Sequence, residues 1–331
     1  MKIIAPFYPH YASTEKADYF KIGADITNGE IVTIDKNSFI GLIWKIWKQN
    51  VHGHGRGFPF PQIACFFAER SVYTFHNNFI GQKWYATMLR RFIFNHYDKI
   101  VVQSEFALNN YTNQGIKPEK LVLIPLPIDY KYYSQNKGNG AEFRKRFGLA
   151  SDEPFAFSIG TSYHKNPEII IEACKIAGIK LLIAGYKDNL QAHKVYSGFK
   201  VGKNISADIK NVIFTGHLRG TDFLDAFVAA TMYLNSSDED GEAMGSAVFE
   251  AASAGVPLCV PDYGTFDCFK NTALFHKNHD AHDLAENIKK YLADPALRKT
   301  NAQKALLIAS NYDYDIVRKQ YELLYKEVGI I

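Results

Sequence analysis

The chain has 331 residues, of which 47% are hydrophobic and 22% are charged, an ordinary composition for a globular protein. One hydrophobic core rarely serves this length, so we expect two lobes of about 150 residues each. The composition excludes a low-complexity or collagen-like chain, and the longest apolar runs are far below the roughly 18 residues of a membrane span. No secretory leader is evident, and four scattered cysteines favour a reducing compartment, so we expect a cytoplasmic protein.

The net charge of +4 conceals an asymmetry between the two halves of the chain. Residues 1–150 carry 19 Lys and Arg against 11 Asp and Glu, a net charge of +8, and the remainder carries 19 against 23, a net charge of −4. A basic half favours an anionic partner such as a phospholipid surface, a pyrophosphate-linked acceptor or nucleic acid. A solvated surface of modest bias explains the same numbers about as well.

Short apolar strands alternate with amphipathic helices through both halves. The strands lack a clean polar alternation, which is typical of strands buried on both faces of a parallel sheet. In chain order the predicted strands cover residues 2–8, 71–75, 99–103, 121–125, 155–160, 180–184, 212–215, 231–235 and 256–260. The predicted helices cover residues 39–49, 82–96, 105–114, 167–177, 222–230 and 245–254, and the pattern after Asp280 is helical through Tyr325. This order predicts a doubly wound α/β lobe, twice over.

The seam between the lobes is predicted at residues 130–152, because 134–140 (Ser-Gln-Asn-Lys-Gly-Asn-Gly) is the most turn-rich stretch of the chain. We therefore expect an N-terminal lobe at residues 1–148 and a C-terminal lobe at residues 149–311, with a last helix at 312–331.

The most informative segment, residues 236–257, contains two glutamates eight positions apart, Glu242 and Glu250, with Gly245 and Ser246 between them. If a helix begins near Gly245, the carboxylates lie roughly 12 Å apart along its axis and can contact two ends of one elongated ligand. The free N–H groups of the helix start suit a phosphate or diphosphate. A nucleotide-sugar fits this arrangement, whereas the spacing alone favours two solvated glutamates on a surface helix.

A second segment, residues 155–167, runs from a buried strand that ends at Gly160 to a helix that begins at Asn166 and Pro167. Asn is a favourable N-cap, and Pro suits the first helical position. Lys165 in this loop can reach a diphosphate as a point charge. A plain strand-to-helix turn is the alternative interpretation.

The run from Glu242 to Pro257 resembles the E-x7-E signature of family 4 glycosyltransferases, including the central Gly245 and the closing Gly-Val-Pro. The resemblance implies the GT-B fold, in which two Rossmann-like doubly wound parallel-sheet lobes face a cleft and the C-terminal helix packs back on the first lobe. In that family the residue matching Glu242 contacts the donor sugar and stabilises charge near the anomeric carbon. The residue matching Glu250 binds the ribose hydroxyls.

Three further segments extend the resemblance. Residues 155–167 resemble the family's loop whose Arg and Lys neutralise the leaving diphosphate, but Thr161 stands where Arg is usual. Residues 212–219 resemble the strand that ends at the nucleobase, and residues 72–77 resemble a strand that ends in a histidine at the cleft. The resemblance implies three catalytic residues, Glu242, His76 and Lys165. It implies donor binding by Gly160, Thr161, Lys165, Gly216, His217, Met244, Gly245, Ser246 and Glu250.

Two other motifs do not predict a metal site. Asp238-Glu239-Asp240 fits a D-x-D pattern, but it precedes the E-x7-E segment, and we interpret it as a solvated acidic loop. His52 and His54 have no acidic or cysteine partner nearby in the sequence and form a weak ligand set. Family 4 enzymes are generally metal-independent, and we expect no metal and no other cofactor.

Two predicted helices bear on partners. Residues 39–49 place Trp44 and Trp47 beside lysines, and residues 82–96 carry basic residues among aromatic ones. Such faces can lie at a bilayer interface. Helices packed on a sheet with lysines outside are the alternative, which we favour for the first helix and weigh evenly for the second.

The sequence and the resemblance together predict a retaining, metal-independent hexosyltransferase. It would move a sugar from a UDP- or GDP-sugar to a glycan or polyprenyl-linked acceptor, in cell-surface polysaccharide or glycoconjugate synthesis. No nucleic acid partner is expected, and peripheral contact with the anionic inner face of the membrane is left open. Two alternatives remain, a non-hydrolysing nucleotide-sugar epimerase and a non-catalytic member that binds a nucleotide-sugar or glycan.

Overall fold

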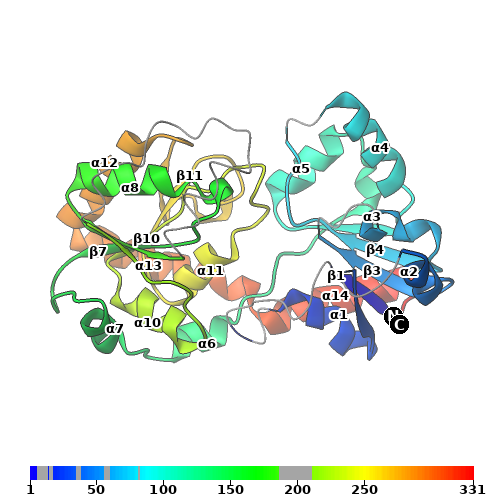
Figure 1. Cartoon of the computed structure of the whole chain (residues 1–331), viewed down its shortest axis with the longest axis horizontal. Coiled ribbons are helices and arrows are strands. Elements are labelled where there is room, and N and C mark those ends of the chain that lie inside the picture. Colours follow the sequence, from blue (N-terminus) through cyan, green and yellow to red (C-terminus); the bar gives the residue numbers. More distant parts are fainter. Residues whose placement is uncertain (6–13, 15–17, 35–38, 56–59, 81–82, 186–210) are drawn as a thin grey trace. The chain divides into compact units, whose positions relative to one another are not determined.

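The computed structural model describes residues 1–331 apart from 6–13, 15–17, 35–38, 56–59, 81–82 and 186–210. The chain forms two compact units, each with its own six-stranded sheet (Figure 1). The first unit comprises Met1–Ile128, Glu239–Met244 and Tyr312–Ile331, and the second comprises Asp129–Asp238 and Gly245–Asn311. All paired strands of both sheets run parallel within the described residues, which confirms the predicted pair of doubly wound lobes.

The sheet of the first unit has the strand order β2-β1-β3-β4-β5-β6. Its strands are β1 (Lys2–Ala5), β2 (Glu30–Thr33), β3 (Asn50–His54), β4 (Arg70–Thr74), β5 (Lys99–Val102) and β6 (Leu121–Leu123). The chain moves from β1 to β2 in one direction and from β3 to β6 in the other. Because crossovers between parallel strands are right-handed, this reversal places the connecting helices on opposite faces of the sheet.

Two helices cover one face of this sheet, α1 (Tyr19–Thr27) and the C-terminal α14 (Tyr314–Val328), which pack on Val72 and Val101. The other face is covered by α2 (Phe39–Ile46), α3 (Phe60–Ile63), η2 (Ala64–Phe66), α4 (Trp84–Phe94) and α5 (Glu105–Asn113). Successive side chains of β4 point to opposite faces of the sheet. Val72 therefore packs against α14 on one face, and Tyr73 packs against α4 and α5 on the other. The predicted return of the last helix to the first lobe is confirmed.

The sheet of the second unit has the strand order β12-β11-β10-β7-β8-β9. Its strands are β7 (Phe155–Ile159), β8 (Lys180–Ala184), β9 (Val212–Phe214), β10 (Met232–Leu234), β11 (Leu258–Pro261) and β12 (Leu274–His276). One face packs on α8 (Pro167–Ala177) and α12 (Ala281–Ala293) through a core of aliphatic side chains. Towards α10 (Thr221–Ala229), Phe157, Phe227 and Tyr233 form an aromatic cluster with ring centroids 5.5–6.2 Å apart.

The boundary between the units lies earlier in the chain than residue 148. Both α6 (Tyr130–Gln135) and α7 (Gly140–Arg146) belong to the second unit, where α6 contacts α11 (Ser246–Ser253) and α7 contacts α10. The predicted seam at 130–152 therefore forms helices of the second unit. After η5 (Asp267–Phe269), the chain continues through α12, α13 (Pro295–Ala309) and η6 (Ser310–Tyr312) to α14.

His52 anchors the C-terminal helix to the first sheet. Its ring Nδ1 lies 2.7 Å from the Tyr325 hydroxyl, and its Nε2 lies 2.7 Å from Thr74 Oγ1. The side chain is fully buried. Burial, and secondarily the neighbouring His76, lowers the pKa of His52 from 6.5 to about 3. The folded chain therefore keeps this imidazole neutral under conditions in which the unfolded chain is protonated.

We predict an acid-sensitive contribution of His52 to stability. Because the pKa is lowered on folding, this contribution is fully present above pH 6.5 and is lost as the pH falls from 6.5 towards 3. Its limiting slope is about 1.4 kcal/mol per pH unit. The His52→Asn variant should unfold more easily at pH 8 but lose less stability between pH 6.5 and 4, as measured by urea unfolding. Equal slopes in both proteins would contradict the assignment.

Candidate functional site

The strand order of the second sheet reverses between β7 and β10. From β7 the chain proceeds to β8 and β9, then returns to the opposite side of β7 to form β10. The connections that leave the carboxyl ends of β7 and β10 therefore diverge to opposite faces of the sheet. In open parallel sheets ligands bind at such a point, outside the carboxyl ends of the strands. The two loops that leave there are residues 160–166 and 235–238.

Hydrogen bonds tie these two loops together. The Asn166 side chain donates from Nδ2 to Ser236 O at 2.9 Å and to Asp238 Oδ1 at 2.7 Å. The Ser236 hydroxyl donates to the carbonyl oxygens of Lys165 and Asn166, both at 2.9 Å. The Asp238 amide donates to His164 O at 2.8 Å. The backbone of the Lys165 loop is thus fixed against the end of β10.

Asn166 begins α8, as predicted, with Pro167 as the first helical residue, but its side chain does not cap the helix. The residue has a left-handed backbone conformation, with φ at 44°. Its amide instead joins the two loops. Asn tolerates this conformation better than most residues, so both backbone and side chain explain the choice of Asn here.

Three neighbouring strand ends form a continuous edge beside these loops. Gly160 N donates to Ala184 O at 2.9 Å, and Gly185 and Gly216 exchange backbone hydrogen bonds of 3.0 and 3.2 Å. Thr161 is buried at 3% exposure, and a Cβ atom on Gly185 would lie only 2.7 Å from its methyl carbon. The stem of Lys165 packs so closely on Gly160 that a Cβ there would lie 3.1 Å from Lys165 Cγ.

The helix α11 begins directly after Gly245, which has a left-handed backbone conformation with φ at 76°. No side chain caps this helix, and the N–H of Val248, its third residue, donates to the Gly245 carbonyl oxygen at 2.8 Å. The N–H groups of the two residues before Val248 have no partner within the helix. Ser246 at the first position is half-buried, whereas Glu250 one turn later is buried at 6% exposure. A buried carboxylate costs free energy unless polar groups or a ligand contact it.

Residues 239–244 belong to the first unit, although they lie between two elements of the second in the sequence. Asn78 Nδ2 donates to the carbonyl oxygens of Glu239 and Glu242, at 2.5 and 2.9 Å. Asp240 accepts from Ile80 N at 2.8 Å through Oδ1. The Asp238-Glu239-Asp240 loop is half-buried, and it is more ordered than a fully solvated loop because Asp238 and Asp240 accept hydrogen bonds through their side chains and Glu239 accepts one through its carbonyl oxygen.

His76 lies in a histidine cluster of the first unit, at the carboxyl ends of β3, β4 and β5. Its Nε2 lies 3.2 Å from His54 Nδ1, and its Nδ1 lies 2.9 Å from Gln103 Nε2. The Tyr19 ring packs on the imidazole with centroids 4.4 Å apart. If Gln103 donates to Nδ1, then His76 donates its own Nε2 proton to His54. Contact of His76 with a ligand would therefore exchange one of these bonds.

Sequence reasoning did not find Gln103 or the role of His54 in this cluster. The signal was present, since both residues fall at the ends of strands that neighbour the strand of His76. The missing step was the strand order, which places β3 and β5 on either side of β4.

The predicted site residues divide between the units. Gly160, Thr161, Lys165, Gly216, His217, Gly245, Ser246 and Glu250 lie in the second unit, and His76, Glu242 and Met244 lie in the first. Hydrogen bonds and packing bring Gly160, Thr161 and Gly216 together with the intervening Gly185. Met244 is buried, and its sulfur accepts a hydrogen bond from Leu126 N at 3.0 Å. His217 is exposed. Their contacts with a donor stay predictions.

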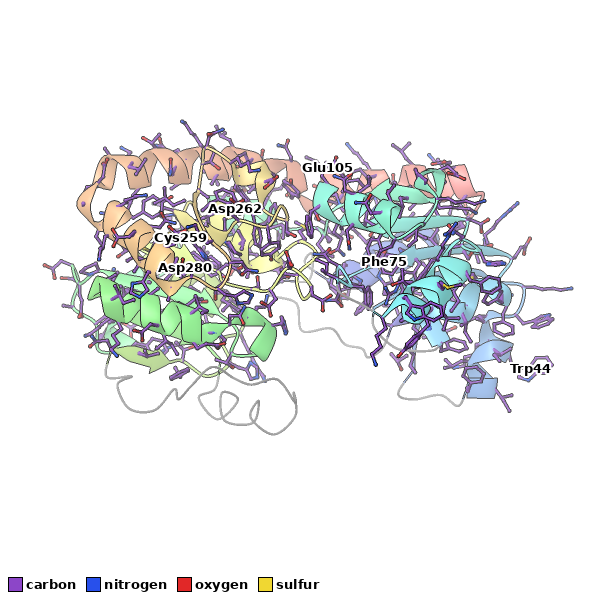
Figure 2. The ribbon with its side chains drawn as sticks, turned by 90° about the horizontal axis from the view of Figure 1, so that it is seen from above. Trp44, Phe75, Glu105, Cys259, Asp262 and Asp280 are labelled. Atoms are coloured by element: carbon purple, nitrogen blue, oxygen red, sulfur yellow. The ribbon has the colours of Figure 1, made fainter. Side chains whose placement is uncertain are left out.

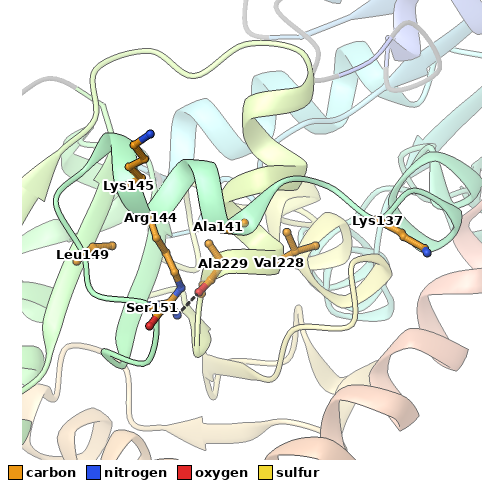
Figure 3. A pocket seen from close by; sticks show the side chains of 10 residues that line it. Lys137, Ala141, Arg144, Lys145, Leu149, Ser151, Val228 and Ala229 are labelled. Atoms are coloured by element: carbon orange, nitrogen blue, oxygen red, sulfur yellow. Dashed lines mark hydrogen bonds between the residues drawn. The ribbon is translucent and has the colours of Figure 1, made fainter.

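A cavity of about 700 Å³ lies elsewhere in the second unit, between α7 and the end of α10 (Figure 3). None of the predicted site residues lines it. Arg144 in its wall donates to three carbonyl oxygens, those of Ala150, Glu153 and Ala229. Its guanidinium thus links α7 to the end of α10 and to residues 150–153, which is a structural role. Among the described residues, no cluster of three or more His, Cys, Asp or Glu side chains could hold a metal ion.

Family models match both units. Residues 140–306 match the model described as glycosyl transferases group 1, and residues 35–132 match the model described as glycosyltransferase family 4. The first of these covers half of the chain. The chain belongs to the glycosyl transferases group 1 family. No curated protein matches the chain in sequence.

Solved structures of similar fold include several glycosyltransferases. HepE of Anabaena in complex with UDP-glucose matches with a TM-score of 0.76 and 16% identity, covering 98% of this chain and 99% of that one. A glycosyltransferase from Rickettsia africae matches with a TM-score of 0.73 and 14% identity, covering 99% and 97%. Sucrose-phosphate synthase from Thermosynechococcus elongatus matches with a TM-score of 0.66 and 19% identity, covering 85% and 73%. These likenesses show the GT-B fold.

For this group 1 glycosyltransferase we predict that the Asn166 amide stabilises the second unit. Both Asn166→Gly and Asn166→Ala remove its two hydrogen bonds and should lower the free energy of unfolding by about 1–3 kcal/mol. Alanine should cost about 1 kcal/mol more than glycine, because of the left-handed backbone. Urea unfolding of the two variants measures the contribution of the hydrogen bonds, from the glycine variant, and the cost of the left-handed backbone, from the difference between the alanine and glycine variants. A glycine variant as stable as the natural chain would show that the tie between the loops contributes nothing.

Proposed function

We propose that the chain is a retaining glycosyltransferase that moves a hexose from a UDP- or GDP-sugar to a glycan or polyprenyl-linked acceptor without a metal ion. One observation carries this proposal. In a member of the glycosyl transferases group 1 family, the uncapped start of α11 follows a left-handed Gly245 and leads within one turn to the buried Glu250. Donated N–H groups and a carboxylate at this spacing match the diphosphate and ribose of one nucleotide.

In this proposal the second unit binds the nucleotide. Lys165 and the first amides of α11 neutralise the diphosphate, and Glu250 accepts from the ribose hydroxyls. Gly160 and Gly185 make room for the Lys165 stem and the Thr161 side chain at this edge, and Gly216 and His217 lie near the base. Among the similar structures, HepE was solved with UDP and with UDP-glucose, which makes UDP the first nucleotide to try.

The proposed reaction breaks the bond between the anomeric carbon and the diphosphate oxygen. An acceptor hydroxyl attacks the same face of the sugar, forms the new glycosidic bond and passes its proton to the departing phosphate oxygen. Configuration at the anomeric carbon is thereby retained. Glu242 contacts the donor sugar and stabilises the positive charge that develops near the anomeric carbon, and His76 contacts donor sugar or acceptor. The Lys165 cation stabilises the leaving group.

Cell-surface polysaccharide or glycoconjugate synthesis is the proposed setting. No helix in the described part of the chain is long and apolar enough to cross a bilayer. The basic first 150 residues, with a net charge of +8, favour an acceptor carrying a pyrophosphate or a contact with anionic lipid, which we propose to occur at the inner face of the membrane.

A non-catalytic binder of nucleotide-sugars is the second candidate, and one observation favours it. Thr161 stands where the family usually has Arg, and its side chain is buried against Gly185, so the position supplies no cation. A non-hydrolysing epimerase would need several acid–base groups around the sugar. In the first unit the His76 nitrogens are already engaged with His54 and Gln103, which makes them poor candidates for that chemistry.

The proposal predicts a selective thermal shift. One nucleoside diphosphate of a panel of UDP, GDP, ADP and CMP should raise the melting temperature without Mg²⁺, because it binds the folded state only. Glu250→Ala should abolish that shift. The matched control is Glu172→Ala, which removes an exposed glutamate from α8 of the same unit and should leave the shift unchanged. If no nucleotide raises the melting temperature, the proposed donor site is wrong.

Glu242→Gln separates the enzyme from the binder. For a transferase this variant should keep the nucleotide shift and lose sugar transfer, with donor turnover lowered by about 100-fold or more. Donor turnover is measured as release of the nucleoside diphosphate from the sugar conjugate that shifts the melting temperature. Absence of turnover in both proteins would favour the non-catalytic candidate, and turnover in the variant equal to that of an active natural chain would remove Glu242 from the proposed reaction.

A further inference from the structure

The outer face of α4 is apolar, which is the reverse of an ordinary surface helix. Its large exposed side chains recur at i, i+1, i+4, i+5 and i+8, so they form one stripe on the helix. They are Trp84, Tyr85, Met88, Leu89 and Phe92, with exposed fractions of 51–74%. The inner face carries Arg90, whose guanidinium lies 4.2 Å from the Phe79 ring centroid and donates to Gln114 Oε1 at 3.1 Å. The stripe is therefore not hidden by the core of the first unit.

A second apolar stripe lies on α2 and continues past its end. Ile40, Trp44 and Trp47 follow one another at i, i+4 and i+7, with exposed fractions of 68%, 75% and 51%. The labelled Trp44 projects away from its helix in Figure 2. The inner side of α2 is formed by Leu42 and Ile46, which pack in the core. The outward tryptophans are thus additional to the residues that hold the helix on the sheet.

Ring contacts join the two stripes into one surface. Trp47 packs on Phe67 with centroids 6.4 Å apart, and the adjacent Phe66 stacks on Phe92 of α4 at 6.1 Å. The strand order explains this, since α2, η2 and α4 all cover the same face of the sheet. We name this the α2–α4 surface. Ten of the 15 large hydrophobic side chains exposed in the described part of the chain lie between Phe39 and Phe92.

The sequence segment that contains the α2–α4 surface is strongly basic. Residues 36–97 contain eight Lys and Arg and one Asp or Glu, a net charge of +7. Among them Lys45, Lys48, Lys83 and Arg91 are exposed, and none forms an ion pair with another described residue. Lys83 lies over the Tyr85 ring, 5.9 Å from its centroid. Exposed tryptophans flanked by unpaired cations are the chemistry that favours the headgroup region of an anionic bilayer.

We propose that the α2–α4 surface docks the protein on an anionic lipid bilayer. The tryptophans and aliphatic side chains enter the headgroup boundary, and the lysines and Arg91 bind lipid phosphates. A second copy of the chain fits less well, because a symmetric contact through this surface would bring two sets of like charges together. The proposal goes beyond the proposed transfer reaction and locates its membrane contact, but the lipid contact does not require that the reaction occurs.

The chain offers an internal reporter for this contact, because all three of its tryptophans, Trp44, Trp47 and Trp84, lie on the α2–α4 surface. Phosphatidylcholine vesicles with about one third phosphatidylglycerol should shift tryptophan emission to shorter wavelength and sediment the protein. Phosphatidylcholine alone should do neither, since about fivefold in affinity is expected per cation near an anionic surface. Absence of binding to the anionic vesicles, or equal binding to both compositions, would overturn the proposal.

Variants test the two components of the surface separately. Trp44→Ser with Trp84→Ser should weaken sedimentation with anionic vesicles by about tenfold or more, and so should Lys45→Glu with Arg91→Glu. Matched controls lie on α14 of the same unit, where Leu323 is 66% exposed and Lys319 is exposed. Leu323→Ser and Lys319→Glu should bind vesicles as the natural chain does. Equal loss in the α14 variants would overturn the assignment of the surface.

Two readouts separate lipid docking from self-association of the chain and from misfolding of the variants. Size-exclusion chromatography without lipid should give the same monomer for the natural chain and the tryptophan variants, and a dimer that the variants dissociate would identify a second copy as the occupant and overturn the proposal. The thermal shift with nucleoside diphosphate should be unchanged in the surface variants, which shows that they fold. Vesicle binding without a nucleotide response would leave the lipid surface standing and remove the proposed function.

Discussion

The reversal of strand order between β7 and β10 is the constraint on which the second unit depends. Because every strand pair is parallel, all carboxyl ends meet at one edge, and the reversal directs the two loops that leave it to opposite faces. Asn166 and Ser236 then join these loops through hydrogen bonds of 2.7–2.9 Å. Two glycines beside them leave room for these loops, since the Thr161 side chain packs on Gly185 and the stem of Lys165 packs on Gly160.

The sheet of the first unit also contains a reversal of strand order, but different side chains lie beside it. Its strand order reverses at β1 and β3, and imidazoles rather than glycines gather at the strand ends that follow. One of them, His52, has a structural role, because its ring hydrogen-bonds the Tyr325 hydroxyl of α14. His54 and His76 share a hydrogen bond nearer the strand ends. The outer sides of α2 and α4 differ from these strand ends because they carry large apolar side chains. These side chains lie outside the core and form an exposed surface.

The sequence predicted the strands buried on both faces well, because their continuous apolar runs leave no other interpretation. It missed β2, β3 and β12, which are short and contain polar residues such as His52 and His276. Glu242 and Glu250 were predicted as site residues from the resemblance of residues 242–257, and that role stays a prediction. No local pattern assigns Glu242 to the first unit, since that depends on Asn78 donating to the carbonyl oxygens of residues 239 and 242. The apolar stripe of α4 was visible as a pattern. Its direction was not, because only Ile93 and Phe94 at the end of α4 are buried and Arg90 packs on the Phe79 ring.

Hydrogen–deuterium exchange with and without nucleoside diphosphate tests most directly where the ligand binds. We expect slower exchange in residues 160–167 and 245–250, because their amides line the edge at β7 and β10 and the start of α11. Exchange in residues 137–151, beside the cavity between α7 and α10, should not change. Protection confined to residues 137–151, or no protection at 160–167 and 245–250 under saturating nucleotide, would contradict the assignment of the donor site to the reversal of the second sheet.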